Sequence, residues 1–463
     1  MTRDMTEGLP LKLILSFSLP LLLGNLFQQT YNMVDAMIVG QVLGSQSLAA
    51  VGASSSVQFL VLGFCMGTCA GFAIPVAQRF GARNYGEMRR FIFLGAVTSA
   101  VIGLSLMLLC SLLCPQILHL LHTPEDIFQD ARIYLLIIFL GIPFSILYNI
   151  LAGILRAVGD SRTPFIFLVI SALLNIGLDL LFIVVFHMGV SGAAVATITS
   201  QALSGFLCLY VVLRKFEILH LRKDECKWNP VLFRQLILTG VPMGLQYSIT
   251  AIGSMMMQSA NNALGSVYVS AFTAGSKLKQ FSMCPFDAFA TAVSTFAGQN
   301  YGAGKIDRVK KGLWQGTAIG CIYGAAIGLV MIFFGRTLAK LFVPANDIAV
   351  LDGAGQYVRC MGFFYWVLGF LNTMRMTTQG LGFSNRAVYS GVMELLARAL
   401  VSLLIVPHFG FPAICFSDQT AWILATLYIT PTCLSCIKKI SREKTFEPPA
   451  GTEITLLKDG AGQ

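Results

Sequence analysis

Charged residues are scarce in this sequence. Only 12% of its 463 residues are Asp, Glu, Lys or Arg, whereas 56% are hydrophobic, and the mean hydropathy is +0.73. A soluble domain carries about 25% charged residues, because charge has to cover its water-facing surface. The shortage therefore excludes a soluble enzyme and a disordered protein. It leaves an all-α integral membrane protein as the fold class.

Motifs for covalent or nucleotide chemistry are also missing. The sequence contains neither a phosphate-binding Walker A loop nor a Gly-x-Ser-x-Gly nucleophile motif. Their absence argues against ATP as an energy source and against hydrolase chemistry. Most of the twelve cysteines lie inside apolar runs, where a thiol behaves as a small hydrophobic group, which excludes a secreted disulfide scaffold. We therefore expect no enzyme activity, no cofactor and no resident metal ion.

Long apolar segments recur along the whole chain. Twelve of them contain the roughly 20 mainly apolar residues that a membrane-spanning helix needs. They are residues 13–39, 53–77, 91–113, 128–150, 165–186, 191–212, 236–262, 268–297, 314–334, 352–374, 389–407 and 413–434. The first run continues to about Gly40, so we expect a spanning helix there and not a cleaved signal peptide.

Basic residues mark one side of the predicted bundle. Most of the 32 Lys and Arg residues fall in the chain ends or in the loops after even-numbered helices, such as 213–235 and 375–388. The opposite loops hold only Arg336 and Lys340, with Arg132 at a helix edge. Because cytoplasmic loops are enriched in Lys and Arg, both termini are predicted to be cytoplasmic. The net charge of +10 then needs no nucleic-acid partner to explain it.

The two halves of the sequence repeat each other. The stretch Ala77–Ala82 in the first half resembles Gly298–Ala303 in the second. Other matches follow in order and at a nearly constant offset: Pro20 with Pro242, Gln58 with Gln280, Asp126 with Asp347, Asn149 with Asn372, and Gly159 with Gly382. Six helices return the chain to its starting side, so the halves run in the same direction and are expected to flank a central cavity.

The duplication predicts the domain organisation. We expect two pseudo-symmetric lobes of six transmembrane helices each, twelve in all, joined by a basic linker. The predicted boundaries are an N-lobe over 1–213 (helices 1–6), a cytoplasmic linker over 214–235, a C-lobe over 236–434 (helices 7–12) and a cytoplasmic C-terminal tail over 435–463.

Several motifs together resemble the multidrug and toxic compound extrusion (MATE) family. They are Tyr31-Asn32-Met33-Val34-Asp35 after Pro20, Val76–Ala82, Gly153–Asp160, Asn175–Asp179 and Gly189–Thr197. The resemblance covers all twelve helices. It implies a cation-coupled exporter of the cell membrane that alternates between inward-facing and outward-facing states. It also implies small-molecule substrates and contact with membrane lipids, and we expect a monomer.

Two acids in the first lobe are the main site candidates. Asp35 and Asp179 fall inside apolar helices, where a charge is costly and therefore commonly functional. Asn175 lies four residues before Asp179 on the same helix face, and Thr197 adds a hydroxyl from helix 6. In the family, a cation site falls on these four positions. Two neighbouring carboxyl groups also resist joint ionisation, so the same site suits Na⁺ or H⁺.

Other candidate residues come from the family resemblance or from residue type alone. The resemblance places Gln28 and Asn149 in the substrate pocket, and Met256 and Met257 offer polarizable surface for varied ligands. Pro20 is predicted to kink helix 1 and to make it a moving part.

In the second lobe the positions of Asn175 and Asp179 are taken by about Glu394 and Arg398. These two are spaced to form an ion pair, as a structural brace or a gating element. The sequence does not place Lys277, Lys279 or Asp287 relative to the cavity.

Three functions fit these observations. The first is a secondary antiporter that exports drug-like or metabolic compounds, driven by Na⁺ or H⁺. The second is a lipid-linked oligosaccharide flippase of the same superfamily, which twelve helices with Asp35 and Asp179 disfavour. The third is a channel or a non-transporting membrane protein, which duplicated lobes with buried carboxylates disfavour.

Overall fold

The computed structural model describes residues 4–121, 123–344 and 346–446, and every regular element in them is a helix. The first half contains α1 (Pro10–Ile38), the π-helix η1 (Val39–Leu43), α2 (Ser45–Gly81), α3 (Tyr85–Leu120), α4 (Glu125–Leu140), α5 (Ile142–Ala157), α6 (Arg162–Asp179), the π-helix η2 (Leu180–Val185) and α7 (Val190–Lys215).

The second half follows after the short helix η3 (Glu217–Leu219). It contains α8 (Pro230–Asn262), α9 (Ser266–Gly302), α10 (Ile306–Ala339), α11 (Ile348–Gly362), α12 (Tyr365–Gly380), α13 (Ser384–Leu400), the π-helix η4 (Val401–Ile405), α14 (Val406–Phe409) and α15 (Phe411–Phe446).

The helices account for the twelve predicted spans. Among the described residues, nine helices are long and apolar enough to cross a membrane, and the pair α4–α5, bent by 45°, makes a tenth. The other two predicted spans, 268–297 and 352–374, fall on α9 and on the pair α11–α12, which are helical but are not among these ten. Both carry charge inside apolar sequence, with Lys277 and Lys279 in α9 and with Arg359 and Arg375 in α11–α12. The predicted all-α membrane fold is confirmed.

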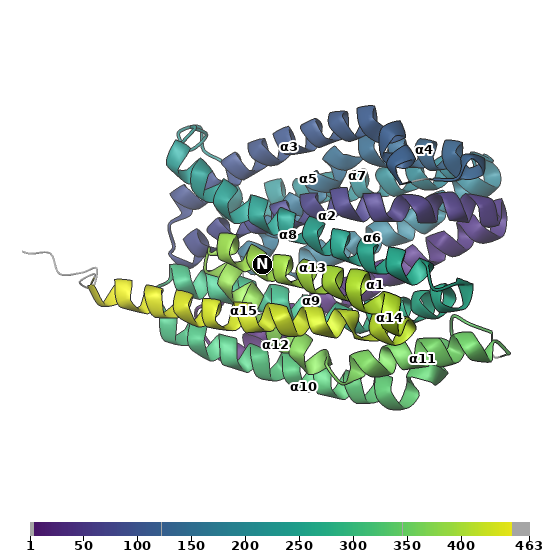
Figure 1. Ribbon diagram of the computed structural model, residues 1–463. Helices are drawn as coiled ribbons and strands as arrows, with labels where there is room; N and C mark the ends of the chain where they lie inside the picture. Colours follow the sequence, from purple (N-terminus) through teal and green to yellow (C-terminus); the bar gives the residue numbers. More distant parts are fainter. Residues whose placement is uncertain (1–3, 122, 345, 447–463) are drawn as a thin grey trace, which may run out of the picture.

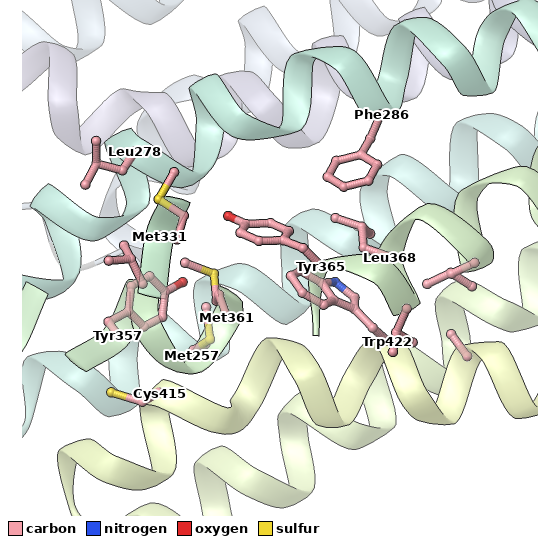
Figure 2. Packing of buried hydrophobic residues seen from close by; sticks show 14 of the residues in the cluster. Met257, Leu278, Phe286, Met331, Tyr357, Met361, Tyr365, Leu368, Cys415 and Trp422 are labelled. Atoms are coloured by element: carbon pink, nitrogen blue, oxygen red, sulfur yellow. The ribbon is translucent and has the colours of Figure 1, made fainter. Parts of the chain in front are cut away.

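Each lobe has its own hydrophobic core, and the outer surface is apolar as well. In Figure 1, α3, α5 and α7 lie in the upper part of the molecule and α10, α11, α12 and α15 in the lower part. Figure 2 shows part of the C-lobe core, where Tyr357, Tyr365 and Trp422 are almost completely buried. Large apolar side chains also line the outside, as on α3, where Leu104 and Leu108 are 53% and 59% exposed. An apolar outer face is what a lipid-facing helix needs.

The backbone repeats the duplication seen in the sequence. Left-handed φ angles occur at Gly44 and Gly265, at Gly159 and Gly382, and at Gly189 and Gly410. The members of each pair are separated by nearly the same stretch of chain as the sequence matches. Each of these glycines lies just outside a helix, in a conformation that a side chain would disfavour. The two halves therefore turn at equivalent points.

The inter-lobe segment is docked on the N-lobe. It separates Lys215, at the end of α7, from Pro230, at the start of α8. The Nε and Nη2 atoms of Arg89 on α3 each donate to the Glu225 carboxylate at 2.6 Å, and both side chains are buried. Charge-assisted paired bonds of this kind are strong and directional. The linker predicted over 214–235 thus includes a fixed loop.

The last helix is longer than the sequence indicated. The final span was predicted to end at residue 434, but α15 continues to Phe446. The first part of the predicted tail over 435–463 is therefore helical. Residues 447–463 lie outside the described residues.

Candidate functional site

Two carboxyl groups meet inside the N-lobe. Asp35 lies near the end of α1 and is half-buried, whereas Asp179 is the last residue of α6 and is fully buried. Their side chains are within hydrogen-bonding reach of each other. The Oδ1 atom of each carboxyl group is buried and accepts no hydrogen bond from the described residues. Two carboxylates cannot donate to each other, so a proton or a cation between them would stabilise this arrangement.

Asn175 and Thr197 complete the predicted group. The Asn175 side-chain nitrogen donates to Thr197 Oγ1 at 3.5 Å. With the amide turned by half a rotation, that nitrogen instead donates to Asp179 Oδ2 at 3.3 Å. Asn175 is 2% exposed, so its amide has few partners other than these. The structure therefore brings all four residues of the predicted cation site together. Carboxylate, amide and hydroxyl oxygens are hard ligands that suit a small cation.

Two tyrosines near the acids escaped the sequence analysis as site residues. Tyr31 on α1 lies close to both carboxyl groups and to Gln28. Tyr134 on α4 also lies near them and near Gln58. The four-residue spacing from Tyr31 to Asp35 could have revealed the first tyrosine. Nothing in the sequence indicates Tyr134, because only the packing of α4 brings it to the site.

The other N-lobe candidates are less closely tied to the acids. Asn149 on α5 is half-buried and donates to its own helix, at Ser145 O, over 2.8 Å. Pro20 lies within α1, fifteen residues before Asp35.

The methionine candidates of α8 have different environments. Met256 is half-buried, whereas Met257 is 2% exposed and belongs to the C-lobe core near Met361 and Tyr357 (Figure 2). Met257 therefore does not line a pocket in this conformation. Its sulfur fills space among aromatic and aliphatic side chains, which is a common use of methionine.

The C-lobe contains a chain of five buried or half-buried charges. Lys279 Nζ is 2.6 Å from Asp418 Oδ2, Arg398 Nη2 is 3.1 Å from Asp418 Oδ1, and Arg398 Nη1 is 3.4 Å from Glu394 Oε2. Arg375 pairs with the other oxygen of Glu394. Signs alternate along the chain, so each acid lies between two cations. The predicted contact of Glu394 with Arg398 exists, but as one link of a longer network.

This network corrects one expectation from the sequence and places a residue that the sequence left open. Arg375 was counted with the basic loop 375–388, yet it is buried in α12 and is 7% exposed. Lys279, which the sequence did not place, pairs with Asp418. These contacts could not be predicted from the sequence, because the charged residues come from four helices, α9, α12, α13 and α15, that are far apart along the polypeptide. Asp287 is exposed on α9 and faces Tyr247 of α8, and Lys277 is also exposed.

The repeated motifs close one end of the molecule. Gln78, at the end of α2, donates to Gly380 O at 3.0 Å, and Gln299, at the end of α9, donates to Ala157 O at 2.8 Å. The two donors occupy equivalent positions of the repeat, and so do the two acceptors. The two lobes thus hold each other through symmetric bonds, at the end that holds the chain's N-terminal residues.

Backbone contact at this closure is very close. A Cβ atom added to Gly81 would lie 1.9 Å from Gln299 O, and one added to Gly302 would lie 1.8 Å from Gln78 O. No side chain fits at either position without moving the lobes apart. The glycine of each repeat is therefore required for the closed arrangement.

The N-terminal residues lie on the same closure. Met5 is fully buried, its N–H donates to Gln299 Oε1 at 2.8 Å, and its carbonyl accepts from Asn300 Nδ2 at 3.1 Å. Arg308 Nη1 donates to Gly8 O at 2.8 Å. A segment that begins the N-lobe is thus bound to the C-lobe.

Comparison with known proteins agrees with the fold and with the duplication. The MatE family model matches the chain twice, over residues 20–181 and 242–404. The chain is 33% identical over 368 residues to the probable multidrug resistance protein YpnP of Bacillus subtilis, covering 79% of this chain and 81% of that protein. It is 24% identical over 452 residues to a FAD transporter of Shewanella oneidensis, covering 96% and 97%.

Among solved structures, a MATE family transporter described as outward-facing superimposes with a TM-score of 0.89. The identity is 20%, and the match covers 94% of this chain and 98% of that one. This likeness supports the fold alone. Together with the double match of the family model, it leads to one conclusion: the chain belongs to the MatE family of membrane transporters.

Proposed function

We propose that this protein is a secondary exporter that couples the efflux of small organic molecules to the entry of H⁺ or Na⁺. The observation that carries the proposal is the contact between Asp35 and Asp179. A proton or a cation stabilises this contact, and its loss leaves two like charges in a poorly solvated site. The site therefore has two states that differ in charge, which is what coupling to a cation needs.

Helix α1 connects this site to the rest of the N-lobe. It carries Pro20, Gln28, Tyr31 and Asp35 within one continuous helix. Proline removes a backbone hydrogen bond and permits a bend. A change of charge at Asp35 is then transmitted along α1 to Gln28, which the family resemblance places in the substrate pocket.

The closed end supports alternating access. The lobes are held together by Gln78 and Gln299 at the end that contains the N-terminus. The positive-inside pattern favours a cytoplasmic location for this end and for both termini. We therefore propose an outward-facing conformation and a place in the cell membrane. Transport requires these bonds to open while others form at the opposite end.

The substrates are drug-like or metabolic compounds. Relatives are named for multidrug resistance and for FAD transport, so the similarity points to small organic molecules and not to one compound. The paired acids Asp35 and Asp179 belong to the N-lobe, whereas the C-lobe network combines three cations with two acids.

The test is efflux from proteoliposomes under an imposed Na⁺ gradient and then under an imposed H⁺ gradient. We expect efflux with one of the two gradients and none without a gradient. Asp35→Asn is expected to abolish it, and Asp126→Asn, which changes an exposed acid in the α4 first turn, is the matched control. Undiminished gradient-driven efflux in Asp35→Asn would contradict the proposal.

A further inference from the structure

A polar stripe lies on the outer face of the C-lobe. Asp352, Gln356 and Arg359 are exposed on α11 at spacings of four and three residues, and Phe363 continues the stripe with 56% exposure. This helix packs against α9, α10 and α15 of its own lobe. Its exposed stripe therefore faces the bilayer, where apolar side chains are expected and polar ones need an explanation.

Only one end of the stripe is compensated within the protein. Arg336, at the end of α10, places Nε 2.5 Å from Asp352 Oδ1. Arg359 lies seven residues further along α11, which is about 10 Å deeper along the helix axis. Its guanidinium has neither an ion pair nor a hydrogen bond within the described chain. Arginine stays charged even at this depth, so its charge calls for an anion from outside the protein.

The side chains around Arg359 form a groove between α10, α11 and α15. Its volume is about 300 Å³. Arg336 and Asp352 line the part near the end of the helices, whereas Arg359 lies deeper, together with Phe363 and Phe416. Along α11 the lining thus runs from the charged Asp352 and Arg359 to the aromatic Phe363, which is also the order of headgroup and acyl chain in a phospholipid.

We infer that this groove binds the phosphate of an anionic phospholipid, in the leaflet at the end opposite the N-terminus. Arg336, Asp352 and Arg359 carry one net positive charge, which matches the single negative charge of a phosphodiester. Arg359 can extend toward the headgroup level and offer several N–H donors to phosphate oxygens. The acyl chain then lies along Phe363 and Phe416. This inference does not depend on the proposed transport activity.

The test compares two lipids with identical acyl chains, phosphatidylglycerol and phosphatidylcholine, titrated onto the purified full-length protein and counted by native mass spectrometry. The parent is expected to bind phosphatidylglycerol about fivefold more tightly, the effect of one favourable cation near an anionic headgroup. Arg359→Gln is expected to lose this preference. Lys340→Gln, which removes an exposed cation at the same end of α10 but outside the groove, should retain it.

Two further arms make the result decisive. Arg359→Met replaces the arginine by an uncharged, flexible side chain and serves as the neutral variant if Arg359→Gln does not fold. Glycerol 3-phosphate, which has the phosphate but no acyl chain, should not displace the lipid. An unchanged lipid preference in a folded neutral variant, or equal binding of glycerol 3-phosphate, would overturn the assignment.

Discussion

Corresponding helices of the two lobes carry their charged side chains in opposite arrangements. In the N-lobe, α6 ends in Asp179, which meets Asp35 with buried oxygen atoms left without donors. In the C-lobe, α13 carries Glu394 and Arg398 within a chain in which every acid lies between cations. A saturated network has one preferred state, whereas a pair of like groups changes state when it gains or loses a cation. From this difference we propose that coupling belongs to the N-lobe and rigidity to the C-lobe.

The largest expected effect tests the assignment of coupling to the N-lobe. Asp179→Asn removes one titratable group and leaves an amide that can donate to Asp35. We expect coupled efflux in proteoliposomes to fall to background, while the melting temperature stays at or above that of the parent, because a like-charge contact is relieved. A folded Asp179→Asn protein with parental efflux would remove this acid from the coupling site.

In the C-lobe the same kind of substitution should act on stability. Glu394→Ala leaves Arg375 and Arg398 buried beside each other, and losing one partner of a buried pair costs about 3–5 kcal/mol. The measurement is thermal unfolding in detergent, with the triple variant Glu394→Ala, Arg375→Met and Arg398→Met as the comparison. The triple variant should recover part of the loss. Parental stability in Glu394→Ala combined with lost transport would instead give the chain a functional role.

The closure offers a symmetric test of both lobes. Gly81→Ala and Gly302→Ala each place a methyl group less than 2 Å from a carbonyl oxygen of the other lobe, so both should open this end. Spin labels on α3 and α10 should show a longer distance between the lobes in either variant. Gly86→Ala is the control, since its added Cβ would meet only Glu225 Oε1, at 3.6 Å. An unchanged distance in both variants would mean that the closure adapts without opening.

The sequence predicted much of this contrast, but not its partners. Apolar length and repeated motifs were sufficient for twelve spans and two lobes, because both are local or periodic signals. Asp35, Asn175, Asp179 and Thr197 were identified from motifs on three helices. Asp418 and Arg375 were not linked to Glu394, because a charge network over four helices has no local spacing.

The prolines of the repeat sharpen the comparison further. Pro20 in α1 and Pro242 in α8 occupy equivalent positions of the two halves, and both lie inside helices. Only α1 also carries an acid of the proposed site. Pro20→Ala should lower the ratio of substrate affinities measured with and without cation, from the 5–150-fold typical of coupled sites toward about one. Pro242→Ala should leave that ratio unchanged. Equal effects of both variants would make bending a property of the whole bundle.

The smallest effect on transport is expected at the inter-lobe loop, where the lobes differ again. Arg89 is buried against Glu225, whereas its counterpart in the repeat, Lys310, is exposed, with Nζ 3.5 Å from Asp307 Oδ1. Hydrogen bonds from Arg89 lower the pKa of Glu225. A carboxyl group whose pKa is lower in the folded state stabilises that state at pH values above the pKa of the group in the unfolded chain, which is about 4.3 for Glu. The stabilisation is lost as the pH falls through the pKa that the group has in the folded state.

The loop should therefore stay docked at neutral pH and become sensitive to protease only below about pH 4. Glu225→Gln keeps the shape of the side chain but removes its charge, so it should undock the loop at every pH, at a cost of about 2 kcal/mol for a charge-assisted bond. Asp307→Asn, in the exposed pair, should change neither the protease pattern nor its pH dependence. Since the bonds described for this loop join it to Arg89 of the N-lobe, efflux should change little in both variants. A large loss of efflux in Glu225→Gln alone would show that the docked loop takes part in the movement of the N-lobe.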